Sequence, residues 1–179
     1  MATRRRVAMC RQGDRVTLPV RVGIGFDIHR LVEGRRLVLA GVDVPHVRGA
    51  LAHSDGDVVL HAVADAILGA AGLGDLGEHF PDTDPAWKDA ASAGILRGAV
   101  AMARQAGWTP TGVDVNVLLE QPKLGAHKAA MRRRLAELLG LPQGAVGLKA
   151  RTLEGLGPIG AGEAVAAQAV VVLAPLGET

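Results

Sequence analysis

The residues with the clearest chemistry are Asp27 and His29, which stand two positions apart at the end of a predicted strand over residues 20–26. Side chains two apart on a strand project from the same face, so both can contact one ion. Carboxylate and imidazole are ordinary zinc ligands, although a catalytic zinc usually has three protein ligands and one open position. Taken alone, the pair is more typical of a hydrogen-bonded strand end than of a metal site.

His61 supplies the missing ligand type near the start of a helix predicted over residues 58–71. If the strand packs beside the start of this helix, Asp27, His29 and His61 form a three-ligand zinc site with one position left for substrate. Asp65 follows one turn later on the same face, where it either orients His61 or pairs with it in solvent.

Further polar residues, His53 to Asp57, lead into this helix. Ser54 and Asp57 have a spacing similar to a capping box, which predicts that Ser54 caps the helix. Asp55 and Asp57 also complement the positive end of the helix dipole. Capping and dipole effects alone therefore account for these three residues, whereas His61 is harder to explain without a ligand.

Two other segments are suited to phosphates and bases. Glu154 begins a glycine-rich connection, and a single carboxylate that keeps waters and phosphate oxygens is how Mg²⁺ is usually held. Taken alone, Glu154 is better explained as an exposed surface residue. The segment Gln121–Gly125 precedes another predicted helix, so its backbone could contact a base while Lys123 meets a phosphate. An ordinary strand-to-helix turn is the simpler explanation of that segment.

The elements that must position these residues follow from hydrophobic periodicity and from glycine and proline breaks. Two prolines hold residues 80–85 in a long loop. The order of elements predicts an α+β fold with a mixed β-sheet and helices packed on one face. We expect strands over residues 20–26, 36–44 with a break at Gly41, 113–119, 145–150 and 164–173, and helices over residues 58–71, 92–106 and 126–139.

Length and composition exclude several classes of protein. A chain of 179 residues fits one domain, which we expect over residues 20–175. Residues 1–19 form a basic leader, which we expect to be disordered. The rest of the chain carries more acidic than basic residues, and this charge balance excludes a nucleic-acid-binding function. The leader could also imitate a transit peptide or reflect an upstream start codon. The apolar stretches are too short to span a membrane, and the single Cys10 fits a cytoplasmic protein.

The motifs together resemble the 2-C-methyl-D-erythritol 2,4-cyclodiphosphate synthase family over residues 21–174. No single motif is specific, but their joint order and spacing are. The matching blocks are Gly23-x-Gly25-x-Asp27-x-His29, Ala52-His53-Ser54-Asp55-Gly56-Asp57 with His61, Gly74-Asp75-Leu76-Gly77, Phe80-Pro81-Asp82-Thr83-Asp84, Gln121-Pro122-Lys123 and Gly160-x-Gly162-Glu163.

This resemblance implies a homotrimer with active sites between subunits. It also implies conversion of 4-diphosphocytidyl-2-C-methyl-D-erythritol 2-phosphate into the cyclic diphosphate plus CMP, a step of non-mevalonate isoprenoid synthesis. Asp27, His29 and His61 would bind one Zn²⁺ per subunit, and Glu154 would bind Mg²⁺ or Mn²⁺ with the substrate diphosphate. His53 and Thr152 match positions that stabilise the transition state in the family.

The resemblance also implies a set of substrate contacts. The methylerythritol phosphate would lie against His53, Ser54, Asp75, Leu76, Gly77, Phe80, Pro81, Asp82, Thr83 and Asp84, with Asp27, Ile28 and His29 beside it. The cytidine would lie against Leu119, Glu120, Gln121, Pro122, Lys123, Leu124 and Gly125, and the nucleotide phosphates against Arg151, Thr152, Leu153 and Glu154.

The chain departs from the family pattern near Glu154. Arg151 and Leu153 replace threonines, so Arg151 could take over hydroxyl contacts to the nucleotide phosphates. Gly155 replaces a common lysine, and Pro158 and Ala161 replace a common phenylalanine and arginine. The last two changes argue against an isoprenoid diphosphate in the central cavity of a trimer.

Two other functions fit the same residues. Asp and His clusters also support attack of water on phosphate, as in a metal-dependent phosphohydrolase. A non-enzymatic trimer with structural zinc and an apolar diphosphate in its cavity is the other alternative. The product formed from the cytidine diphosphate substrate distinguishes these three functions.

Overall fold

The computed structural model describes residues 20–81, 83–84, 87 and 90–177. The expected leader, residues 1–19, and the expected substrate residue Asp82 lie outside the described residues. Within the described part, no helix is both long enough and apolar enough to cross a membrane.

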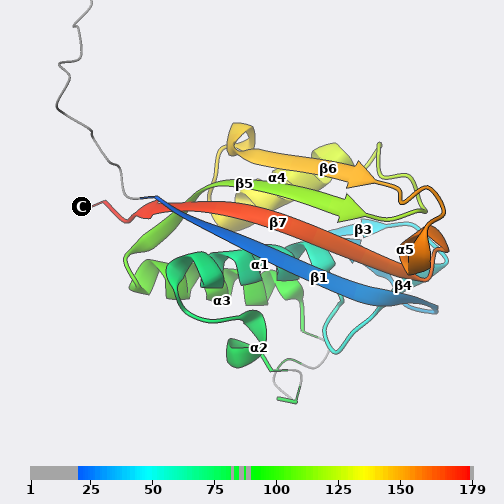
Figure 1. Cartoon of the computed structure of the whole chain (residues 1–179), viewed down its shortest axis with the longest axis horizontal. Coiled ribbons are helices and arrows are strands. Elements are labelled where there is room, and N and C mark those ends of the chain that lie inside the picture. The colour runs from blue at the N-terminus through cyan, green and yellow to red at the C-terminus, as the bar shows by residue number, and fades with distance from the viewer. Residues whose placement is uncertain (1–19, 82, 85–86, 88–89, 178–179) are drawn as a thin grey trace, which may run out of the picture.

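One five-stranded mixed sheet forms the centre of the fold (Figure 1). Its order is β4-β1-β7-β5-β6, in which β5 and β6 run parallel and the other neighbours are antiparallel. These pairings confirm the expected mixed sheet. The strands are β1 (Arg21–Glu33), β4 (Arg48–Leu51), β5 (Trp108–Leu118), β6 (Val146–Arg151) and β7 (Ala164–Pro175), and a separate hairpin is formed by β2 (Leu37–Leu39) and β3 (Val42–Val44).

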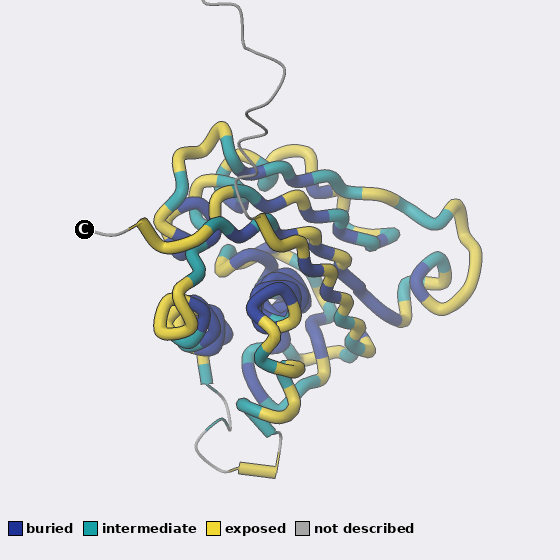
Figure 2. Tube along the Cα trace, turned by 60° about the vertical axis from the view of Figure 1, so that its left-hand side comes forward, coloured by how far each residue is buried: buried dark blue, intermediate teal, exposed yellow. Residues whose placement is uncertain are grey.

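Three longer helices pack against one face of this sheet, as expected from the sequence. They are α1 (Val58–Ala71), α3 (Ser92–Gln105) and α4 (Lys128–Leu139). Figure 2 shows α1 as a dark blue, buried helix in the middle of the molecule, because it lies between β1 and α3. The short helices α2 (Leu76–His79) and α5 (Gly157–Gly160) and the 3₁₀ turn η2 (Gln143–Ala145) complete the described elements.

Glycines in β1 allow α1 to approach the sheet closely. A Cβ atom built at Gly23 would lie 1.9 Å from the Ala66 carbonyl oxygen, and one at Gly25 would lie 2.1 Å from the Ala62 carbonyl oxygen. Real Cβ atoms do not come this near to backbone oxygens, so only glycine fits at both positions. The same close contact brings the first turn of α1 to Asp27.

A pair of glycine substitutions tests this contact. Gly25→Ala should destabilise the fold by roughly 2–4 kcal/mol, because the new methyl group pushes α1 away from β1. Gly69→Ala is the matched control: Gly69 is exposed on α1 and a Cβ there meets nothing within 4 Å. That change should stabilise the fold by up to about 1 kcal/mol. Chemical denaturation measures both, and equal stability of the two variants would contradict the account.

The chain differs from the sequence-based expectation at several elements. The first strand continues to Glu33, so Asp27 and His29 lie inside β1 and not at its end. The run over residues 36–44 forms the separate β2–β3 hairpin. The periodicity gave no sign of β4, α2 or α5, because each has only four residues. Such short elements depend on tertiary contacts more than on local pattern.

Asp57, and not Ser54, caps α1, so the expected capping role of Ser54 is wrong. Burial raises the pKa of the Asp57 carboxyl to about 6, and backbone N–H groups, led by that of Gly41, act in the opposite direction. The carboxylate joins the β2–β3 hairpin to the start of α1, since it accepts four backbone N–H groups, those of Ala40, Gly41, Val59 and Leu60.

The opposite face of the sheet is apolar and exposed in the single chain. Large side chains of β1 point to this face, and they alternate with residues that are buried under α1. Val170 of β7 lies directly beside Ile24 in the strand register. The exposed fractions on this face are large for such residues: Val22 64%, Ile24 64%, Phe26 55%, Ile28 47% and Val170 39%.

Candidate metal centre and adjoining cavity

A cavity of about 360 Å³ lies between β1, the β4–α1 connection and the start of α3. Its lining combines polar side chains, among them those of Asp27, His29 and His61, with apolar ones. The lining residues are Asp27, His29, Leu51, Ala52, His53, Ser54, His61, Leu76, Phe80, Trp87 and Ile95.

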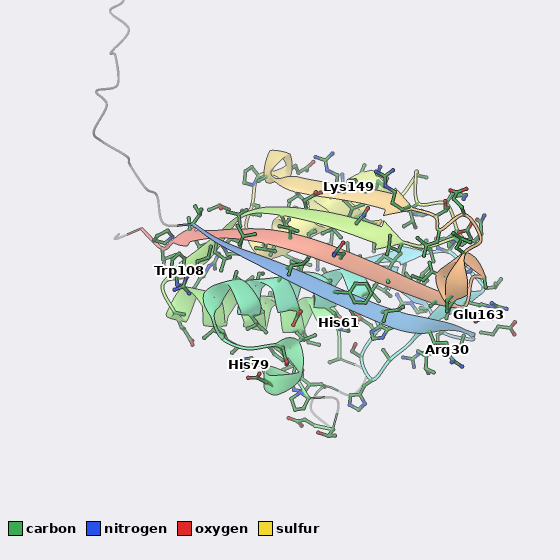
Figure 3. The ribbon with its side chains drawn as sticks, viewed as in Figure 1. Arg30, His61, His79, Trp108, Lys149 and Glu163 are labelled. Atoms are coloured by element: carbon green, nitrogen blue, oxygen red, sulfur yellow. The ribbon has the colours of Figure 1, made fainter. Side chains whose placement is uncertain are left out.

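Asp27, His29 and His61 converge at this cavity, as the sequence predicted. The Asp27 Oδ2 atom lies 2.9 Å from His61 Nδ1 and 3.2 Å from His29 Nε2. The two ring nitrogens are 3.4 Å apart. His61 reaches this point because α1 packs directly beneath β1 (Figure 3).

The electrostatics of Asp27 fit a metal-binding carboxylate. Burial opposes its ionisation, but hydrogen bonds to His29 and His61 and their positive charge hold the pKa of its carboxyl well below its usual range. The carboxylate is therefore charged at neutral pH and can bind a cation without losing a proton first.

The three residues fit zinc by donor type and by spacing. One ligand atom from each side chain lies within 4.8 Å of the other two, which suits a single ion between them. Two imidazole nitrogens and one carboxylate oxygen are a common donor set for catalytic zinc, with the fourth position open. A group bound in the cavity would be able to reach a metal held by these residues, because all three line it.

His53 and Ser54 lie next to the metal centre on the β4–α1 connection. The His53 Nε2 atom is buried and has no hydrogen-bond partner among the described residues. Because a buried polar atom without a partner is costly, this nitrogen is suited to hydrogen-bond a group bound in the cavity. The Ser54 hydroxyl oxygen accepts the Gly56 N–H at 3.2 Å and lies 3.3 Å from His61 Nε2.

Arg35 holds this connection in place. Its guanidinium donates to the carbonyl oxygens of Ala50, Ala52 and Ser54 at 3.1–3.4 Å. Arg35 therefore fixes the backbone on both sides of His53. Sequence reasoning missed this residue, because an arginine in a short loop gives no local signal of distant carbonyl partners.

The apolar wall of the cavity comes from α2, the following loop and α3. Phe80 and Trp87 meet edge to face with 5.0 Å between ring centroids, and Phe80 also packs against Gly98. Asp65 accepts the Leu76 N–H at 3.1 Å, so it positions α2 and is not a partner of His61. Of the neighbouring expected residues, Asp75 caps α2, Gly77 is exposed, Pro81 is half-buried, and Thr83 and Asp84 are exposed.

The expected nucleotide residues form a second group at the carboxyl end of β5 and β6. The Leu119 N–H donates to the Arg151 carbonyl oxygen at 2.9 Å, and Glu120 accepts the Leu153 N–H at 3.1 Å. Thr152 donates its hydroxyl to the exposed Glu154 at 2.5 Å. Among the described residues, none of this group lines the cavity beside the metal centre.

Three expected substrate residues have side chains that point elsewhere. Leu119 and Leu124 are each 4% exposed and belong to the hydrophobic core, so only their backbone could contact a nucleotide. Ile28 lies on the exposed apolar face of the sheet, because it alternates with Asp27 and His29 along β1. Gln121, Pro122, Lys123 and Gly125 are exposed or half-buried.

The sequence did not predict that Leu51, Ala52, Trp87 and Ile95 line the cavity. Leu51 belongs to the unpredicted strand β4, and Trp87 and Ile95 come from the loop before α3 and from α3 itself. Only the packing of α3 against α1 brings them to the site. The aromatic type of Trp87 beside a proline-rich loop is the one local signal that could have indicated it.

The fold and site define a class: a mixed-sheet α+β protein with a three-ligand metal centre beside a half-apolar cavity. The chain belongs to the YgbB family, whose model matches residues 20–174. It is 57% identical to the 2-C-methyl-D-erythritol 2,4-cyclodiphosphate synthase of Salinibacter ruber over 86% of this chain and 98% of that protein.

Solved structures agree with this placement. A structure of 2C-methyl-D-erythritol-2,4-cyclodiphosphate synthase in a CDP-bound form has a TM-score of 0.80 and 46% identity, covering 86% of this chain and 99% of that one. The bifunctional IspDF of Campylobacter jejuni gives a TM-score of 0.84 and 43% identity. This chain spans 42% of the bifunctional protein, and the alignment covers 88% of this chain.

Proposed function

We propose that the chain is a 2-C-methyl-D-erythritol 2,4-cyclodiphosphate synthase. It converts 4-diphosphocytidyl-2-C-methyl-D-erythritol 2-phosphate into the cyclic diphosphate and CMP. The observation that carries this proposal is the convergence of Asp27, His29 and His61 at a cavity where the buried Nε2 atom of His53 has no partner within the described part of the chain. Relatives named as this synthase are 50–57% identical over the aligned residues, which supports the same assignment.

The chemistry requires charge neutralisation and alignment. A 2-phosphate oxygen attacks the β-phosphorus, a new P–O bond forms, and the P–O bond to CMP breaks so that CMP leaves with the electron pair. Two negatively charged groups must approach in this step, so their repulsion has to be offset. A zinc ion bound by Asp27, His29 and His61 would supply Lewis-acid stabilisation of phosphate charge.

The residues around the cavity provide the alignment. His53 has a free ring nitrogen that can donate to a phosphate oxygen, and Ser54 lies next to it with a hydroxyl group. The apolar side chains of Leu76, Phe80 and Trp87 line the same cavity and would lie against the carbon skeleton of the methylerythritol. We assign transition-state stabilisation to His53 and, from the nucleotide side, to Thr152.

Glu154 is the residue that we assign to a second cation, Mg²⁺ or Mn²⁺, bound together with the substrate diphosphate. It is exposed at the end of β6 with Thr152 as its hydrogen-bond partner, so its carboxylate is accessible to a hydrated ion. Segments 119–125 and 151–154 are joined by the hydrogen bonds of Leu119 with Arg151 and of Glu120 with Leu153, and we assign the cytidine and its phosphates to them.

Glu154→Gln tests this assignment, because the amide keeps the shape but loses the charge. Activity should fall by roughly a hundredfold or more, while zinc content remains that of the wild type. Glu163→Gln, a change of another exposed carboxylate, is the matched control. If the activity of Glu154→Gln depends on added Mg²⁺ and Mn²⁺ in the same way as the activity of Glu163→Gln, then Glu154 holds no cation.

A homotrimer with active sites between subunits accounts for two features of the single chain. The metal centre and the expected nucleotide segments form separate groups, since none of the described nucleotide residues lines the cavity beside the metal centre. The apolar face of β1 and β7 is exposed and needs a cover. We propose that neighbouring copies cover this face and bring the nucleotide segments of one subunit to the metal centre of the next.

We also propose that residues 20–175 form the catalytic unit and that the enzyme acts in the cytoplasm. The family match over residues 20–174 supports the first statement. A biosynthetic role on a small substrate and the single Cys10 support the second.

The product of the purified chain tests the proposed function. Incubation with the cytidine diphosphate substrate, Zn²⁺ and Mg²⁺ should give the cyclic diphosphate and CMP in equal amounts. Release of inorganic phosphate would indicate a phosphohydrolase instead. No turnover by a zinc-loaded protein would leave only the structural-zinc alternative.

A further inference from the structure

The buried side of the His61 ring has its own partner. While Nδ1 faces Asp27, the Nε2 atom lies 2.8 Å from the Ser92 hydroxyl oxygen. Ser92 is the first residue of α3 and is completely buried. This contact joins α3 to a metal ligand on α1.

Asp55 in turn binds Ser92 through both carboxylate oxygens. One oxygen accepts the Ser92 backbone N–H at 3.1 Å, and the other accepts the Ser92 hydroxyl hydrogen. The Asp55 N–H donates to the Ala90 carbonyl oxygen at 3.1 Å. The connection before α1 and the start of α3 are thus held together by a two-sided contact.

The direction of these hydrogen bonds follows from the groups involved. A carboxylate only accepts, so the Ser92 hydroxyl donates its hydrogen to Asp55. The oxygen of Ser92 must then accept from His61, which places a hydrogen on Nε2. With Nε2 turned to Ser92, Nδ1 is the ring nitrogen that faces Asp27 and His29, where the metal is expected.

Ser54 is the competing partner, but the geometry favours Ser92. The Ser54 oxygen is 3.3 Å from His61 Nε2, against 2.8 Å for Ser92. It already accepts the Gly56 N–H. Within the described part of the chain, only Ser92, and not Ser54, donates both its N–H and its hydroxyl hydrogen to Asp55.

We propose that Ser92 and Asp55 are positioning residues for the metal centre. Through Ser92, the Asp55 carboxylate fixes the His61 tautomer and ring orientation and makes Nδ1 a better ligand. The inference rests on the proposed function only in that zinc binds Asp27, His29 and His61. Local sequence assigned Asp55 no role beyond the helix dipole, and it indicated Ser92 only as the start of the helix expected over residues 92–106.

Zinc affinity measured by chelator competition tests this inference without reference to turnover. Ser92→Ala should weaken zinc binding about 10- to 100-fold, the range typical for loss of such a partner. Asp55→Asn should weaken it less, by roughly three- to tenfold, because a neutral oxygen polarises Ser92 less. Ser54→Ala is the matched control and should change zinc affinity by less than about threefold.

A spectroscopic measurement separates positioning from a general loss of structure. In the zinc-loaded wild type, the His61 Nε2 proton should give a downfield NMR signal that exchanges slowly with water, and nitrogen shifts should place the metal on Nδ1. Both Ser92→Ala and Asp55→Asn should speed exchange of this proton. If Ser92→Ala does not fold, Asp55→Asn carries both measurements.

The outcomes distinguish this inference from the proposed function. Wild-type zinc affinity in Ser92→Ala, or an equal loss in Ser54→Ala, overturns the role of Ser92. Metal bound through Nε2 overturns it as well. A wild-type chain that binds no zinc overturns the proposed function and this inference together.

Discussion

Replacing His61 with alanine should empty the metal centre and reduce activity by roughly a thousandfold or more. His61 supplies one of three ligand atoms and lies inside the fold, so solvent cannot easily take its place. Loss of Lewis-acid stabilisation worth several kcal/mol corresponds to about three orders of magnitude in rate. Metal analysis after dialysis and steady-state kinetics measure the two effects.

The control for this change is His46→Ala, which removes a half-buried imidazole outside the cavity. This variant should keep its zinc and its activity. Asp27→Asn provides a second test in the metal centre, since it retains the shape of Asp27 but not its charge. One zinc per chain in His61→Ala, held with wild-type affinity, would reject the assignment of His61 as a ligand.

Placing a charge on the exposed sheet face should separate the subunits. Ile24 is 64% exposed in the single chain and lies beside Val170 of β7. In the proposed trimer, Ile24→Glu buries an unpaired carboxylate in every subunit, which costs several kcal/mol per copy. Light scattering should then show a mass near 18.5 kDa in place of three times that value.

This variant should also lose activity but keep its zinc. The metal ligands lie on the helix-covered side of β1, opposite to Ile24, whereas the nucleotide segments would come from a neighbouring copy. Val47→Glu is the control, because Val47 is 76% exposed but lies outside the sheet. A monomeric wild type, or full activity in monomeric Ile24→Glu, would show that one chain suffices.

The long elements and the metal ligands could be predicted because their signals are local. Alternation along β1 and helical periodicity along α1 each need only a short window of sequence. Once that helix packs on β1, His61 necessarily joins Asp27.

The supporting residues could not be predicted because their partners are distant in the chain. Ser92 contacts His61 because the first residue of α3 packs against α1. Arg35 donates to three backbone carbonyl groups of residues 50–54, which are distant in the chain. Ser54 looked like a helix cap from its spacing, yet Asp57 takes that position because its carboxylate also reaches the β2–β3 hairpin. Tertiary contacts, which local sequence does not show, therefore decided which of Ser54 and Asp57 caps α1.

The origin of the oxygen atoms in the products tests the proposed cyclisation most directly. Because the attacking phosphate belongs to the bound substrate, no water enters the reaction. An intramolecular attack of this kind can gain about 7–11 kcal/mol over an intermolecular one. The reaction in ¹⁸O-labelled water, followed by mass spectrometry, should give unlabelled cyclic diphosphate and unlabelled CMP. Label in either product would mean that water attacks phosphorus, and it would contradict the cyclase mechanism.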